Sequence, residues 1–282
     1  MNSLFSKKAK KLVAQGDSYI KRNGVKNFHL QAKELLTNSQ MHDDFDIKQL
    51  AAASFDKSFK LKQNFEHLEF SDLPITIARG EQCFIDIYFW RRRPTVIHDH
   101  HFYGAFQCLV GQNVDSEFKF RPINKLTKFH TQGELELIKT KTLKKGDIES
   151  INFLNKFIHQ NHHQADLTVN LCFRTNDQGK KNLSNYFYSG LKFEKDPASL
   201  SRIYRLLAFA QIEKIDPRKL NLNLIDAFNF LIMTYYSNST HPNFIKLKKY
   251  FNAKVTKETG LKIDFLLNAH EKILNKIEEE YE

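Results

Sequence analysis

The spacing of apolar residues changes twice along this chain, and that change constrains the fold more than any other feature. From Leu4 to about Leu68 apolar residues recur every three or four positions with almost no Gly or Pro, which is typical of helices. From about Pro74 to Arg174 they alternate with polar residues, as in strands. After Gly190 the helical spacing returns. We therefore expect an α+β protein with helical ends.

The alternating segments are short and separated by turn residues. CFIDIYF, VDSEFKF and LTVNLCF alternate strictly, and glycines occur between the expected strands at positions 80, 111, 133 and 146. This pattern favours an antiparallel sandwich or barrel. The expected organisation is a helical region over residues 1–72, a central antiparallel β-barrel (jelly roll) over 73–192, and a second helical region over 193–282.

Composition narrows the classes of partner. The net charge is +11, but the lysines are scattered and no zinc-finger or RNA-binding signature is present, so nucleic acid is not the expected partner, whereas a small anionic substrate fits. We find no apolar stretch of the roughly 18 residues that a membrane span needs, and the N-terminus lacks the apolar core of a secretory signal. The three cysteines lie in apolar runs, which favours reduced thiols and a cytoplasmic protein. Oligomeric state is left open.

The segment TVIHDHH gathers three histidines and an aspartate within four positions. On a strand, His98 and His100 project to the same side, close enough to bind one ion, while Asp99 points away. Neutral imidazole suits iron, nickel, copper or zinc. The alternative to a metal site is that these histidines form a solvated polar turn, with His101 simply the next residue in it.

A third ligand has to come from a distant strand. The segment FIHQNHH offers three candidates. His159 follows two apolar residues and is best placed on a strand, so it is the expected ligand. His163 and His162 are the alternatives, and both are expected in a turn.

The spacing around these histidines resembles the first motif of the cupin family. That motif is HxH, three or four residues, Glu, six residues and Gly. Here His100 is followed by three residues, Gly104, six residues and Gly111, so Gly104 stands where the family has Glu. In the thiol dioxygenase branch of the family, which includes cysteine dioxygenase, the Glu is also replaced, by Cys or Gly. This segment therefore resembles that branch. The resemblance covers about Ile75 to Arg174.

This resemblance implies a cupin-like barrel with a three-histidine site of His98, His100 and His159. Fe(II) is the implied metal, with Zn, Ni or Mn as alternatives, and O2 the co-substrate. The implied substrate-binding arginines are Arg79, Arg91 and Arg93, although each also fits a solvated surface position. The residues expected around the site are Trp90, Tyr103, Asn170, Cys172 and Arg174.

Two other functions remain open from the sequence. The chain is alternatively a cupin enzyme with another metal and chemistry, or a non-catalytic cupin-fold protein that binds a partner through its basic helical extensions. The helical regions are expected to act either as a lid over the barrel mouth or as a binding surface.

Overall fold

The computed structural model describes residues 4–54, 71–91, 94–125, 130–179, 184–187, 190–194 and 256–257. The N-terminal part contains helices α1 (Leu4–Asn23), α2 (Phe28–Ser39) and α3 (Ile47–Ser54). The strands that follow are β1 (Leu73–Arg79), β2 (Cys83–Trp90), β3 (Ile97–His98), β4 (Gly104–Val110), β5 (Gln112–Lys125), β6 (His130–Lys144), β7 (Ile148–Ile151), β8 (Ile158–His163), β9 (Thr168–Thr175), β10 (Ser184–Phe187) and β11 (Leu191–Glu194), with a short 3-10 turn at Leu154–Lys156.

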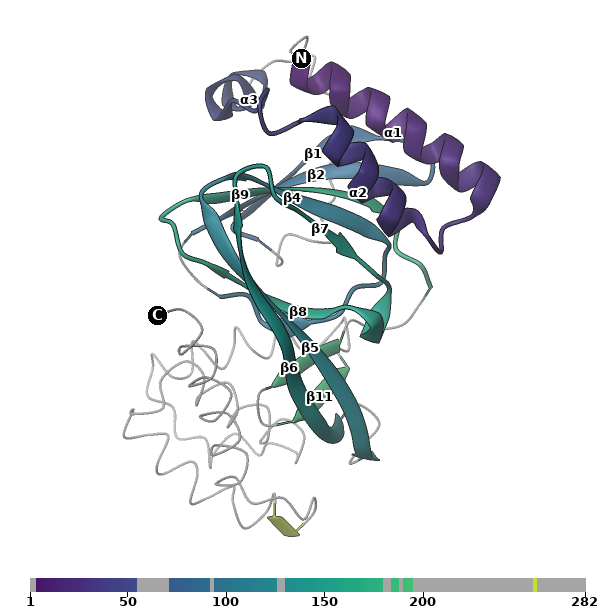
Figure 1. The fold of residues 1–282 in the computed structure, drawn as a ribbon, viewed down its shortest axis with the longest axis vertical. Helices are drawn as coiled ribbons and strands as arrows, with labels where there is room; N and C mark the ends of the chain where they lie inside the picture. Colours follow the sequence, from purple (N-terminus) through teal and green to yellow (C-terminus); the bar gives the residue numbers. More distant parts are fainter. Residues whose placement is uncertain are drawn as a thin grey trace, which may run out of the picture. The chain divides into compact units, whose positions relative to one another are not determined.

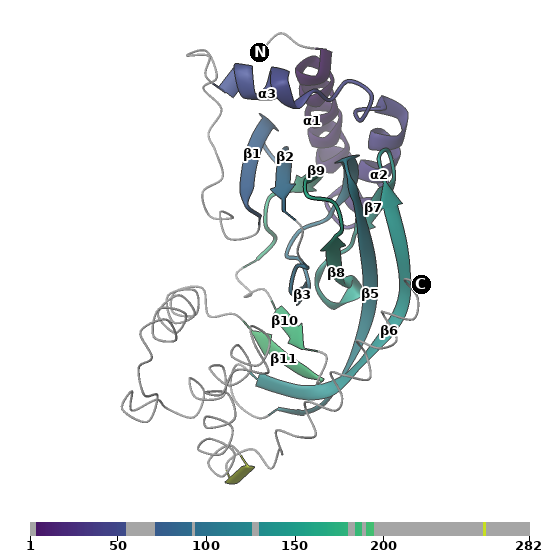
Figure 2. The ribbon, with the colours of Figure 1, turned by 90° about the vertical axis from the view of Figure 1, so that its left-hand side faces the viewer.

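The strands form two antiparallel sheets, so the expected α+β class with antiparallel strands is confirmed. The first sheet has the order β1-β2-β9-β4-β7, and the second has the order β10-β11-β6-β5-β8-β3. Figure 2 shows the long strands β5 and β6 side by side. The expected helices of residues 193–282 lie outside the described residues, except for positions 256–257. The expected boundaries near residues 72 and 192 stay predictions.

The chain divides into two compact units. The first comprises residues 1–119 and 136–183, and the second comprises residues 120–135 and 184–282. In the second unit, β11 pairs with both β10 and the start of β6, and the rings of Phe120 and Tyr186 lie 5.2 Å apart. All that follows concerns the first unit. None of the described helices is both long and apolar enough for a membrane span.

Helices α1 and α2 cover one face of the first sheet (Figure 1). Cys83, Ile85 and Ile87 of β2 belong to the core cluster that these helices form with the sheet. The approach is close because α1 has a glycine at the contact: a Cβ atom at Gly16 would lie 2.7 Å from the Sγ atom of Cys83. Burial of this large apolar surface is the main stabilising contribution here.

A half-buried carboxylate connects α1 to the turn between β1 and β2. The two oxygens of Asp17 accept hydrogen bonds from the backbone N–H groups of Glu81, Gln82 and Cys83 at 2.8, 3.0 and 3.1 Å. Charge-assisted bonds of this kind are stronger than neutral ones. They fix the register of the helix against the sheet.

The opposite face of the first sheet lines a second core. Its buried members come from both sheets and the intervening loops: Tyr88, Trp90, Phe102, Phe106, Leu143, Ile151, Phe157 and Cys172. The strands of the first sheet are therefore buried on both faces, and β2 shows this over nearly its whole length. Helices α1 and α2 therefore cover the outer face of the sheet and form no lid over its inner face. The C-terminal region, to which the same alternative applies, lies outside the described residues.

Candidate metal centre

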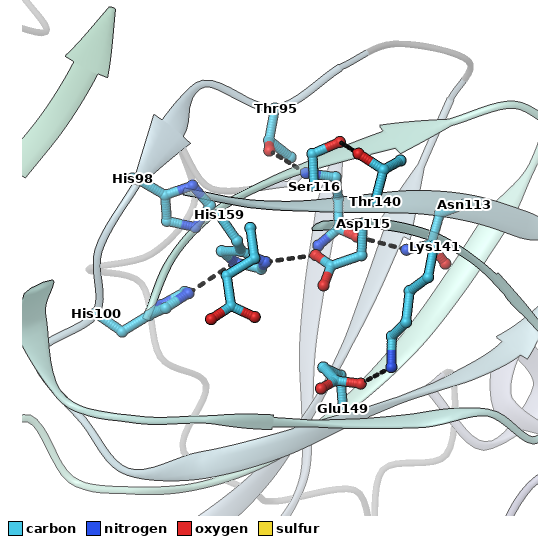
Figure 3. A network of polar contacts seen from close by, with 12 residues as sticks. Thr95, His98, His100, Asn113, Asp115, Ser116, Thr140, Lys141, Glu149 and His159 are labelled. Carbon is cyan, nitrogen blue, oxygen red and sulfur yellow. Dashed lines mark hydrogen bonds and ion pairs between the residues drawn. The ribbon is translucent and has the colours of Figure 1, made fainter. Parts of the chain in front are cut away.

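Three buried histidines meet between the sheets. His98 ends β3, His100 lies two residues beyond it, and His159 is on β8 directly opposite His98 in the antiparallel register. Their candidate ligand atoms all lie within 4.8 Å of one another. Each side chain is at most 4% exposed, and Figure 3 shows the three rings directed toward one another.

Hydrogen bonds fix the orientation of two of the rings. The Nδ1 atom of His159 donates to the Oδ1 atom of Asp115 at 2.7 Å, and Nδ1 of His98 donates to the carbonyl oxygen of Val96 at 2.8 Å. A proton on Nδ1 leaves the lone pair on Nε2, which faces the cluster. A histidine held by a carboxylate in this way is the usual arrangement behind a metal ligand.

The ring of His100 contacts the ring of His159. The Nε2 atom of His100 lies 2.9 Å from Nε2 of His159. Since the latter is an acceptor, His100 carries the proton between them, and a shift of that proton to its own Nδ1 frees a third lone pair.

Burial keeps the imidazoles of His98 and His100 neutral. It lowers the pKa of His98 to about 3, with a further contribution from His159. Burial, followed by the neighbouring His98 and His159, also lowers the pKa of His100 well below its ordinary value. Neutral nitrogen donors at this spacing fit Fe(II), Zn or Ni. The residues present therefore fit a metal ion.

The alternative third ligands lie elsewhere, and their expected position in a turn is wrong. Both belong to β8, because the pairing with β5 continues as far as Asn113 and His163. His163 is buried with its ring stacked on Trp90 at 4.6 Å. His162 is exposed. Neither belongs to the cluster of three histidines.

The expectation of a solvated polar turn around His98 is also wrong. Asp99 is 2% exposed and His101 is 5% exposed, so the whole HDHH segment is buried. The ring of His101 lies 6.2 Å from that of Phe153.

Two of the three arginines expected to bind substrate, Arg79 and Arg91, do not line the cavity beside the histidines. Arg79 is exposed and its guanidinium lies over the ring of Phe84 at 4.5 Å. Arg91 is also exposed, and its backbone N–H donates to Asp72. Arg93 lies outside the described residues, as does its neighbour at position 92.

A cavity opens beside the cluster and includes two of its rings. Its lining residues are Tyr88, Trp90, Thr95, His100, Phe102, Phe106, Ile151, His159, Asn161, Asn170 and Cys172. The empty space, including its solvent-open part, is about 390 Å³. Of the residues expected around the site, Tyr103 is not in this wall. Its ring stacks with Phe153 at 5.3 Å and with His29 at 6.0 Å.

A buried ionic network lies behind the cavity. Arg174 is 1% exposed; its Nη1 donates to Asp177 at 2.9 Å and its Nε lies 3.7 Å from Asp86. Asp86 also accepts from Thr76 at 2.7 Å and from the Tyr88 hydroxyl at 2.9 Å. Burial opposes the charge of Arg174, but Tyr88 and Asp86 raise its pKa overall. Burial and then Asp86 raise the pKa of Tyr88.

Sequence reasoning missed the two acids that organise this region. Asp86 interrupts an otherwise apolar strand, and an acid in such a run is a signal of a buried polar network. Asp115 carried no such signal, because its alternating strand resembles one with a solvated face.

Gly104 has a steric reason in this structure. A Cβ atom at this position would lie 2.5 Å from the carbonyl oxygen of Phe173 and 2.9 Å from Cα of Arg174. The tight pairing of β4 with β9 therefore leaves no room for a Glu or Cys side chain here.

Comparison with known proteins finds no matching family model and no matching curated protein. Among solved structures, a cupin-2 domain protein from Rhodospirillum rubrum aligns at 12% identity with a TM-score of 0.26, covering 38% of this chain and 61% of that one. This chain thus spans less than two thirds of that protein.

Two enzymes give similar alignments. Hydroquinone 1,2-dioxygenase from a Sphingomonas species, solved with 4-hydroxybenzoate bound, aligns at 7% identity and a TM-score of 0.30, covering 43% of this chain and 71% of that one. The DMSP lyase DddQ from Ruegeria pomeroyi aligns at 11% identity and a TM-score of 0.27, covering 38% and 48%. Overlaps this small say nothing about the chemistry of this chain.

Proposed function

We propose that this chain is a metal-dependent oxygenase of the cupin type, with Fe(II) held by His98, His100 and His159. One observation carries the proposal: three buried imidazoles, one of them oriented by a carboxylate, converge at the wall of a cavity. Such a donor set binds a divalent ion without neutralising its charge.

The groups around the histidines would orient the metal ligands and surround the substrate. Asp115 and the carbonyl of Val96 hold the rings of His159 and His98, so that their Nε2 lone pairs face the ion. Fe(II), when bound, would supply a centre that activates O2 beside the substrate, and no external reductant is needed if both oxygen atoms enter the substrate. The aromatic side chains of the wall give that place apolar surroundings.

The thiol dioxygenase assignment has less support than the metal centre. It requires a cation for the substrate carboxylate, and Arg79 and Arg91 are both exposed away from the cavity wall. We therefore propose an oxygenase whose substrate contacts the cavity wall, without restricting that substrate to thiols. Zinc, nickel or manganese at the same three histidines would indicate a different cupin chemistry.

The test is elemental analysis of untagged full-length protein, purified without chelators. His98→Ala removes one ligand, and His162→Ala is the matched control because His162 is exposed on the same strand as His159. We expect near-stoichiometric iron in the native protein and the control, and its loss in His98→Ala. Oxygen uptake is then screened with small substrates.

Two results would contradict the proposal. Full metal retention by His98→Ala would exclude the three-histidine centre. Zinc or nickel, lost in the same variant, would keep the centre and refute the iron oxygenase.

A further inference from the structure

The cavity wall beside the histidines is aromatic and carries no formal charge among its described residues. Besides the imidazoles of His100 and His159, four aromatic side chains line it, and no Lys, Arg, Asp or Glu does. They are Tyr88, Trp90, Phe102 and Phe106. Aromatic walls favour flat ligands, because stacked and edge-on ring contacts stabilise them beyond simple burial. An ion entering this wall would lose its hydration without gaining a counter-charge.

The nearest charges behind the wall are already neutralised. Arg174 is enclosed between Phe84 and Phe102, with its guanidinium 4.3 and 4.5 Å from the two ring centres. Asp86 and Asp177 both face that guanidinium. The Nε and Nη2 atoms of Arg174 make no hydrogen bond within the described part of the chain, but Arg174 is not among the residues that line the cavity, so no cation of the described residues lies in the wall to pair with a substrate carboxylate.

One polar group is directed at the cavity without a partner. Asn170 is 4% exposed, lines the cavity, and its Oδ1 atom makes no hydrogen bond among the described residues. It lies opposite Tyr88 in the register of β2 and β9. A buried acceptor without a partner is destabilising by roughly 1–3 kcal/mol, so a ligand that donates a hydrogen bond to this oxygen recovers that interaction.

We propose that this cavity binds an uncharged, planar small molecule whose ring lies among the aromatic side chains and whose polar group pairs with Asn170. Phenols and aromatic amides belong to this class. That such molecules are substrates rests on the proposed oxygenase function. That they bind in the cavity depends only on the cavity wall.

The experiment uses Trp90, the single tryptophan of the chain and part of the wall. Its emission is titrated in full-length protein dialysed against a chelator, with residual metal measured in the same sample. The probes are benzamide and benzoate, which have nearly the same shape but differ by one charge. We expect saturable binding of benzamide, and benzoate binding weaker by roughly a hundredfold, since burial of an unpaired carboxylate is costly.

Variants test the polar contact. Asn170→Leu should weaken benzamide binding roughly three- to tenfold, the effect of one lost hydrogen bond. Asn170→Ser keeps a polar group and should give a smaller loss, which separates the contact from a folding defect. Asn23→Leu, on the exposed end of α1, is the control. Thermal unfolding is measured for all three variants.

Three outcomes would overturn the inference. Equal or tighter binding of benzoate would show that the wall recognises anions. Unchanged benzamide affinity in Asn170→Leu would remove the polar contact, and no change in Trp90 emission with either probe would exclude the cavity as a binding site. Failure to take up metal would refute the proposed oxygenase without altering these titrations, so the two failures are distinguishable.

Discussion

Replacing Asp115 by Asn should weaken metal binding without unfolding the protein. The Oδ1 atom of Asp115 lies 2.7 Å from Nδ1 of His159, and the two side chains are 1% and 2% exposed, so solvent does not screen the contact. The Asn side chain has nearly the same shape as Asp, and its Oδ1 atom still accepts the hydrogen bond. It lacks the negative charge that makes the His159 imidazole a stronger electron-pair donor to a metal ion. Loss of such a partner raises the metal dissociation constant roughly 10- to 100-fold, about 1.4–2.7 kcal/mol.

The assay is a competition titration of the full-length protein with Zn²⁺ against a chromophoric chelator. Glu117→Gln is the matched control, because it makes the same chemical change two residues along β5, where the carboxylate pairs with Lys139 at 2.8 Å. We expect its affinity to match that of the native protein. An Asp115→Asn affinity within twofold of native, with an unchanged unfolding midpoint, would refute the role assigned to Asp115.

Three further predictions follow from single contacts. Gly104→Ala should lower the free energy of unfolding by roughly 1–3 kcal/mol in urea denaturation, because the new Cβ atom would lie 2.5 Å from the carbonyl oxygen of Phe173; an unchanged midpoint would contradict the steric argument. His163→Ala should keep its metal in elemental analysis but change Trp90 emission, since the ring stacks on that indole; metal loss would make it a ligand. Burial raises the pKa of Cys172 to about 12, so this thiol should stay protonated and resist a thiol reagent at pH 8 until the chain unfolds, and rapid labelling of native protein would contradict its burial.

The sequence was sufficient for the element types and for part of the site. Helical spacing predicted α1 and α2, and strict alternation predicted β2, β5 and β9. These predictions hold because apolar spacing reflects which side chains must leave water, whatever covers them. The proximity of His98 and His100 follows from local geometry, although β3 ends at His98 and only the chain direction beyond it brings His100 back to the cluster.

What covers each face could not be predicted, since it depends on contacts distant in sequence. VDSEFKF alternates like a strand with one solvated face, yet Asp115 is buried because β8 brings His159 to it from 44 residues away. The run QNHHQ resembles a turn, but β8 continues through it because Asn113 of β5 pairs with His163. Pairing of backbone groups with a neighbouring strand outweighs the local preference of polar residues for turns.

The first sheet separates stability from chemistry by using the two faces of the same strands. Ile85, Ile87 and Leu171 belong to the core that the sheet forms with α1 and α2, and they supply apolar burial on that face. The neighbouring positions Asp86 and Asn170 can then be polar and buried, at a site where such groups would otherwise weaken a core. The N-terminal helices thus contribute to the proposed function although they lie on the face of the sheet away from the histidines: they stabilise a sheet whose inner face is free to carry a cavity.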